Sequence, residues 1–194
     1  MTTQSTLTRA ASHSAQTGAA RTNSAAAISL AVLRVSMGFV FLWGFLDKAF
    51  GLHYPTPSSK AWIHGGSPTK GFLTSVDVGP LQSWFHSIAG TWWADWLFML
   101  GLLGIGLTLI LGVLMYAGTA AGVLLLGLMW LAEFPLAQHT SAGVASGSTN
   151  PFADYHYIYA LVLVVLALTG AAQTWGLGRM WAAQPVIRRH PWLR

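Results

Sequence analysis

Four long apolar runs constrain this chain more than any other feature. They cover residues 28–50, 94–115, 117–136 and 155–175. The hydrocarbon layer of a bilayer is about 30 Å thick, and about 20 residues of α-helix cross it. A spanning segment must satisfy its own backbone hydrogen bonds, so it is either a helix or part of a closed barrel, whose strands alternate apolar and polar residues. These unbroken runs therefore predict an all-α integral membrane protein folded as a four-helix bundle.

The composition agrees with a lipid environment and divides the chain into three parts. The chain of 194 residues is 54% hydrophobic and 8% charged, whereas soluble domains are about 25% charged. Residues 1–27 are mostly Ser, Thr and Ala without an acidic residue, so we expect a disordered tail there. We expect the four transmembrane helices in residues 28–176 and a basic tail in residues 177–194.

The distribution of basic residues predicts how the helices cross the membrane. The first long loop contains Lys60 and Lys70, and the loop of residues 137–152 contains no basic residue apart from histidine. Six arginines lie in the two tails: Arg9, Arg21, Arg179, Arg188, Arg189 and Arg194. Because basic residues concentrate on the cytoplasmic side, both termini should be cytoplasmic. The basic C-terminal tail fits an anionic inner leaflet better than nucleic acid.

The first extracytoplasmic loop, residues 51–93, is too long to lack structure in a compact domain. Apolar residues recur at helical spacing within residues 80–90, namely Leu81, Trp84, Phe85 and Ile88. This pattern predicts a short amphipathic helix that lies on the membrane or covers the bundle.

Arg34 is an unusual residue inside the first apolar run. On a helix it shares a face with Gly38 and, further along, with Lys48. A long basic side chain near a span end can reach water along the lipid surface. However, small residues such as Gly38 permit close helix packing. The shared face therefore favours an inward position and a structural role for Arg34.

The sequence LRVSMGFVFLWGFLDKAFG, residues 33–51, resembles the first helix of the DoxX/DoxD family of small bacterial membrane proteins. GGSPTKGFL, residues 65–73, and NPFADYH, residues 150–156, are similar to segments of the longer DoxD-like members. The resemblance implies four spans and a bacterial plasma-membrane location. It also implies the activity for which the family is named, that of the membrane subunit of a thiosulfate:quinone oxidoreductase. Activity inferred in this way is an analogy.

The residue inventory restricts the cofactors. The chain has no Cys, so it offers no thiol relay, iron–sulfur ligand or thiolate metal site. Its histidines do not fall on facing helices as haem ligands would. We therefore expect no metal site and no covalently bound cofactor. A bound ligand would be menaquinone, another quinone or another amphipathic small molecule. Electrons would pass directly between bound substrates or through a redox partner subunit.

The candidate site lies at the extracytoplasmic mouth of the bundle. Glu133 ends the third run, where a carboxylate opposes the helix dipole, so we expect Lys48 to pair with it. Asp154 and His156 begin the fourth run, and a histidine exchanges protons near neutral pH. The candidates for proton exchange are thus His156, Asp154 and Glu133. The predicted ligand-binding residues are Lys48 and three aromatic residues that would form the walls of the site: Trp96, Trp130 and Tyr159.

These residues also have purely structural explanations. Aromatic side chains collect at membrane interfaces, and polar side chains are common at wet helix ends. Two functions follow from the sequence. The first is a quinone-linked redox membrane subunit, and the second is a non-catalytic scaffold or accessory subunit that recruits a redox partner. The sequence leaves open whether the chain is itself an enzyme.

Overall fold

The computed structural model describes the backbone of residues 2–193 and the side chains of residues 24–193. The helices are α1 (Thr2–Phe50), α2 (Lys70–Thr74), α3 (Gln82–Ile88), α4 (Trp92–Leu111), α5 (Met115–Glu133), α6 (Tyr155–Leu168), α7 (Gly178–Ala182) and α8 (Pro185–Arg189). Four short 3-10 helices are η1 (Ser58–Lys60), η2 (Trp62–His64), η3 (Ala171–Gln173) and η4 (Pro191–Leu193). No strand occurs among residues 2–193, which confirms the all-α class. The tail predicted to be disordered, residues 1–27, lies largely outside the residues whose side chains are described.

Among the described residues, three helices are long and apolar enough to cross a membrane: Ser24–Phe50 within α1, α4 and α5. The fourth apolar run forms a shorter helix than the predicted span of residues 155–175. α6 has 14 residues, a length of roughly 21 Å at 1.5 Å per residue. It ends because Gly170 adopts a left-handed conformation, with φ of 66°, and the chain then turns into η3.

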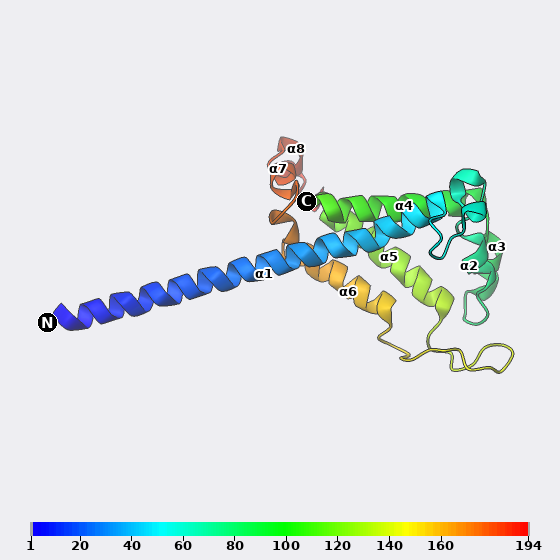
Figure 1. Ribbon diagram of the computed structural model, residues 1–194, viewed down its shortest axis with the longest axis horizontal. Helices are drawn as coiled ribbons and strands as arrows, with labels where there is room; N and C mark the ends of the chain where they lie inside the picture. Colours follow the sequence, from blue (N-terminus) through cyan, green and yellow to red (C-terminus); the bar gives the residue numbers. More distant parts are fainter. Residues whose placement is uncertain (1, 194) are drawn as a thin grey trace.

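The four long helices run alternately up and down in two pairs (Figure 1). α1 packs along α4, and α5 packs along α6. α4 and α5 form a hairpin whose turn begins at Gly112, with φ of 73°. We call the end where α5 finishes at Glu133 and α6 starts at Tyr155 the loop end, and the end near Gly112 the tail end. The pairs lie close at the tail end and diverge toward the loop end, where α2 and α3 lie.

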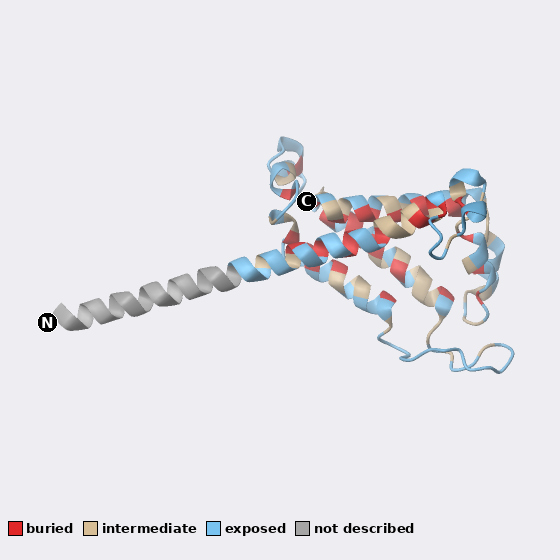
Figure 2. Cartoon of the chain, viewed as in Figure 1, coloured by how far each residue is buried: buried red, intermediate tan, exposed pale blue. Residues whose placement is uncertain are grey.

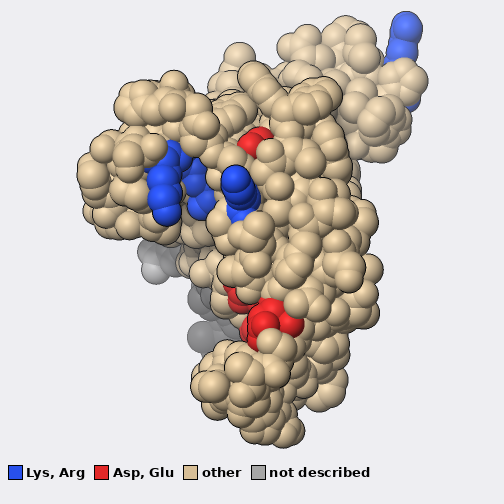
Figure 3. All heavy atoms as spheres, turned by 90° about the vertical axis from the view of Figure 1, so that its right-hand side faces the viewer, with Lys and Arg blue, Asp and Glu red and all other residues tan. Residues whose placement is uncertain are grey.

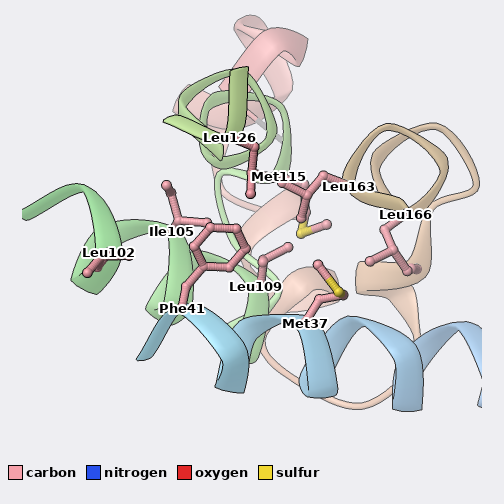
Figure 4. Close-up of a cluster of buried hydrophobic side chains, with 10 residues drawn as sticks. Met37, Phe41, Leu102, Ile105, Leu109, Met115, Leu126, Leu163 and Leu166 are labelled. Carbon is pink, nitrogen blue, oxygen red and sulfur yellow. The ribbon is translucent and has the colours of Figure 1, made fainter. Parts of the chain in front are cut away.

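Two clusters of buried apolar side chains hold these elements together. The larger one lies among all four long helices (Figure 4), and its members are Met37, Phe41, Leu102, Ile105, Leu109, Met115, Leu126, Leu163, Leu166 and Ala171. Figure 2 shows the buried residues along the facing sides of the helices, with exposed residues outside. A smaller cluster joins α2 and α3 to α5 through Leu73, Val76, Phe85 and Ala132. The second cluster fixes the loop end.

Gly38 and Gly106 let α1 and α4 approach almost backbone to backbone. A Cβ atom on Gly106 would lie 2.8 Å from the backbone nitrogen of Leu42 and 3.1 Å from the carbonyl oxygen of Gly38. By contrast, a Cβ atom on Gly101 or Gly104 would meet no atom within 4 Å. Only some of the glycines in the second apolar run therefore serve helix packing.

Arg34 is completely buried, and its guanidinium group joins three segments. Nη1 donates to the carbonyl oxygens of Leu109 and Ile110, the latter at 3.0 Å. Nη2 donates to the carbonyl oxygens of Thr174, at 3.3 Å, and Trp175. The last carbonyls of a helix lack intrahelical partners and carry partial negative charge. Arg34 thus neutralises the end of α4 without an acidic partner.

We predict that Gly106→Val destabilises the protein and that Gly104→Val does not. The added side chain at residue 106 must push α1 away from α4, and such overpacking costs about 1–3 kcal/mol. Thermal unfolding in detergent measures the difference, because both variants make the same chemical change on the same helix. Equal melting temperatures for the two variants would contradict this packing.

We predict that Arg34→Lys lowers stability and that Arg34→Met lowers it further. A lysine keeps the charge but cannot form the planar fork of bonds, and losing charge-assisted hydrogen bonds costs about 1.5–3 kcal/mol each. The free energy of unfolding in detergent is the measurement. Leu33→Met, on the exposed side of the same turn, serves as the control and should match the parent. A stable Arg34→Met variant would show that the carbonyl contacts contribute little.

Candidate functional site

The site forms where α5 ends and α6 begins. Glu133 is the last residue of α5, and Phe134 then takes a left-handed conformation with φ of 41°. Asp154 caps the start of α6, since its Oδ1 accepts a hydrogen bond of 3.0 Å from the backbone nitrogen of Tyr157. Because α5 and α6 are antiparallel neighbours, the last turn of one faces the first turn of the other.

Four side chains meet in this place. Nδ1 of His156 lies 2.8 Å from Oδ2 of Asp154 and 3.9 Å from Oε2 of Glu133. The hydroxyl of Tyr155 donates to Oε1 of Glu133 at 2.8 Å. An ionised carboxylate only accepts hydrogen bonds, so Asp154 selects the imidazole tautomer that carries its proton on Nδ1. The unprotonated nitrogen of a neutral His156 is then Nε2.

The Nε2 atom of His156 is buried and has no hydrogen-bond partner among the described residues. The residue as a whole is 1% exposed. The indole nitrogen of Trp130 is likewise buried without a partner in that part of the chain. Trp130 lies one helical turn before Glu133 on α5, so both are on the same side of that helix. Buried polar atoms are nearly always hydrogen-bonded, so these two atoms can take a further partner.

The carboxylates lie beside a hollow of about 430 Å³ at the loop end. Its walls come from the segment after α2 and from the loop between α5 and α6, and they include Asp77, Glu133, Asp154 and Tyr155. His156 and Trp130 are not among its lining residues. Figure 3 faces this end and shows most of the acidic atoms gathered apart from the basic ones. The acids thus border the hollow, while the imidazole is buried beside them.

Asp77 ties the two walls of the hollow together. Its carboxylate accepts hydrogen bonds from the hydroxyl and from the backbone nitrogen of Ser141, the second at 2.7 Å. These bonds stabilise the ionised form and hold the pKa of Asp77 below its ordinary value. The loop between α5 and α6 is thereby fastened to the α2–α3 segment.

Lys48 does not join the site, and the expected Lys48–Glu133 pair is wrong. No ion pair between them occurs in the described part of the chain. Lys48 instead places Nζ 5.9 Å from the ring centre of Phe98, on α4. The physical reason is the packing of α1, which runs along α4 rather than along α5. Glu133 receives its hydrogen bond from Tyr155 instead.

The predicted wall residues are divided between two places. Trp96 is half-exposed on α4 and packs edge-on against Trp62, with ring centres 4.7 Å apart. Tyr159 packs against Tyr155 at 6.0 Å, next to the site. Tyr155 is not among the site residues predicted from the sequence. Its position as the first residue of the helix that faces Glu133 is the signal that could have identified it.

Two other acids at the loop end are structural. Asp95 is buried at the start of α4, and its Oδ1 accepts bonds from Ser67, at 3.0 Å, and from the Thr69 hydroxyl, at 2.6 Å. The GGSPTKGFL segment is thus attached to α4. Asp47 is buried at the end of α1 and accepts a 3.2 Å bond from the backbone nitrogen of Tyr54. These acids hold the first loop and are separate from the candidate site.

The donor atoms of Glu133, Asp154 and His156 lie within 4.8 Å of one another. This spacing is compatible with a metal ion. However, Asp154 already accepts from His156, and Glu133 accepts from Tyr155. The hydrogen-bond network accounts for the cluster without a cation.

We predict that acidification releases the Asp77–Ser141 contact. A carboxylate with a depressed folded pKa stabilises the contact fully above its unfolded pKa, and this contribution is lost as the pH falls through the folded value. Hydrogen exchange at the Ser141 amide, corrected for the intrinsic rate, should therefore rise at low pH. Asp77→Asn should show the faster exchange at neutral pH as well. Unchanged protection in that variant would contradict the assignment.

Comparison of the chain with protein-family models, with curated proteins and with solved structures finds no match. The resemblance to the DoxX/DoxD family rests on the sequence motifs of residues 33–51, 65–73 and 150–156 and stays a prediction. A functional assignment therefore depends on the geometry at the loop end.

Proposed function

We propose that the chain is a quinone-binding subunit of the membrane with four transmembrane helices and both termini in the cytoplasm. Three helices of sufficient length and apolarity support the membrane location, and the arginines of the two tails support the orientation. The shorter α6 crosses by local thinning of the bilayer, which accommodates short spans at modest cost. The loop end then faces the extracytoplasmic side.

The observation that carries the proposal is the hydrogen-bonded pair of Asp154 and His156 with a buried, unpartnered Nε2. With Nδ1 bonded to a carboxylate, Nε2 of the neutral imidazole accepts a hydrogen bond from a hydroxyl group. A reduced quinone presents such a hydroxyl. When His156 is protonated, Nε2 donates instead to the carbonyl of an oxidised quinone. One side chain can therefore bind both forms and exchange a proton with them.

The second feature in favour is the position of the two carboxylates. Asp154 and Glu133 line the hollow that opens at the loop end, whereas His156 is buried behind them. A proton taken up at Nε2 allows the one on Nδ1 to pass to Asp154 and onward to water. The imidazole thus joins the apolar interior, where a quinone dissolves, to the extracytoplasmic solvent.

Two aromatic residues support a ring-shaped ligand. The indole nitrogen of Trp130 is a buried donor without a partner among the described residues, and it suits the second oxygen of a quinone. Tyr159 lies beside Tyr155 near the same place. Trp96 and Lys48 have no part in this site because they pack against Trp62 and Phe98.

The reaction that fits these residues is the quinone half of an oxidoreductase. The chain supplies ligand binding and proton exchange, and it has no Cys for an electron relay. A redox partner or a second substrate must exchange the electrons with the quinone. Such a chain, which binds the quinone and leaves electron exchange to a partner, agrees with the resemblance to the membrane subunit of a thiosulfate:quinone oxidoreductase. In the alternative, a non-catalytic scaffold, the polar hollow would receive a redox partner and no quinone.

The test is menaquinone binding to the purified protein in detergent or nanodiscs. We expect His156→Ala to weaken binding by at least tenfold, because it removes the atom that contacts the ligand. Asp154→Asn should weaken binding less, since the ring remains but its tautomer is no longer fixed. His139→Ala is the matched control, because His139 is an exposed histidine of the nearby loop.

The comparison is valid only for variants that unfold at the temperature of the parent. If His156→Ala is as stable as the parent and binds menaquinone equally well, the quinone site is wrong. A soluble redox protein that co-purifies with such a variant in equal amount would then favour the scaffold.

A further inference from the structure

The segment that follows η3 is folded and attached to the tail end of the bundle. The backbone nitrogen of Leu177 donates to the carbonyl of Leu111, the last residue of α4, at 2.8 Å. Nε of Arg179 donates to the carbonyl of Gln173 at 2.6 Å, and the indole of Trp181 donates to the carbonyl of Leu193 at 2.7 Å. Residues 175–193 therefore form a compact unit, which we call the C-terminal platform.

The C-terminal platform extends sideways from the bundle. In Figure 1, α7 and α8 stand beyond the tail end of α4, and Trp181 and Ala182 of α7 line a pocket with Met115 and Tyr116 of α5. The hydrogen bond from Leu177 places the start of α7 at the level where α4 ends. A bundle whose helices cross a membrane has its surrounding lipid headgroups at this level. Within the platform, η4 contacts α5, while the exposed side chains of the platform lie at the level of the lipid headgroups.

The platform exposes large apolar side chains. They are Trp175, Leu177, Met180, Val186 and Trp192, of which Met180 and Trp192 are 67% and 65% exposed. Ile187 is buried, whereas these other apolar residues remain exposed. Tryptophan at the boundary between lipid and water is energetically favoured. This surface suits the interfacial layer of a bilayer.

The charge of the platform is entirely positive. Arg179, Arg188 and Arg189 are exposed, and no acidic residue occurs after Asp154 in the sequence. A folded segment that combines exposed apolar residues with basic ones binds anionic membrane surfaces. Each basic residue near such a surface adds attraction that falls off within a Debye length.

We propose that the C-terminal platform lies in the headgroup layer and binds anionic phospholipids. The proposal rests on the membrane location of the bundle and is independent of quinone binding. The apolar side chains enter the boundary of the acyl chains, while Arg188 and Arg189 contact the phosphate groups. An anchor of this kind holds the tail end of α4 and the Arg34 carbonyl contacts at a fixed depth.

The first test compares lipids as stabilisers of the detergent-solubilised full chain. Phosphatidylglycerol should raise the melting temperature more than phosphatidylcholine, with inorganic phosphate having no effect. In the Arg188→Gln/Arg189→Gln double variant, the apparent affinity for phosphatidylglycerol should fall on the order of tenfold. Lys60→Gln/Lys70→Gln is the matched control, since it removes two exposed cations from the loop end. Equal effects of the two lipids, or an equal effect of free phosphate, would overturn the proposal.

The second test locates the platform directly. The chain has no Cys, so a single cysteine at Val186 or Val144 can carry a spin label. These valines are similarly exposed, at 60% and 64%, but Val144 lies in the loop between α5 and α6. In nanodiscs containing phosphatidylglycerol, the label at residue 186 should be more accessible to oxygen and less accessible to a water-soluble nickel complex. Labels with the same accessibility at both positions would overturn the proposal.

Discussion

The contact of Arg34 with the end of α4 is the interaction on which the rest of the structure depends. A single guanidinium group donates to carbonyls of α4 and of the segment that follows α6. Its positive charge is buried without a carboxylate, and the exposed carbonyl dipoles at the helix end compensate for it. A lone acid in this place would change protonation with pH, whereas carbonyl dipoles do not. The contacts of Arg34 therefore do not depend on the protonation state of a carboxylate.

The loop end is held in a different way, and this difference bears on function. Its elements are joined by a small apolar cluster around Phe85 and by hydrogen bonds to Asp95 and Asp77. Carboxylates there serve both as attachment points and as members of the candidate site. His156 has both roles. Its Nδ1 is hydrogen-bonded to Asp154, while its Nε2 has no partner among the described residues. Such a division is expected where a side chain must be held in place and yet contact a ligand.

The sequence predicts those features that depend on neighbours along the chain. Apolar runs identify the long helices, and because consecutive spans are antiparallel, the end of α5 with Glu133 is expected near the start of α6 with Asp154 and His156. The sequence does not predict which helices lie side by side. The predicted ion pair of Lys48 with Glu133 is wrong because α1 packs on α4. Composition alone also misses where a helix ends. The apolar run continues past Leu168, but Gly170 turns the chain.

The close crossing at Gly38 and Gly106 has a mechanical consequence. Because the backbones of α1 and α4 are in close contact there, we expect these two helices to move together as one rigid lever and α5 with α6 to form the other. The contacts of Arg34 lie at the end where the levers meet, so that end acts as the pivot. A small rotation about the pivot displaces the far ends most. His156 stands near such a far end, and a change of a few degrees between the levers therefore alters the space beside its ring.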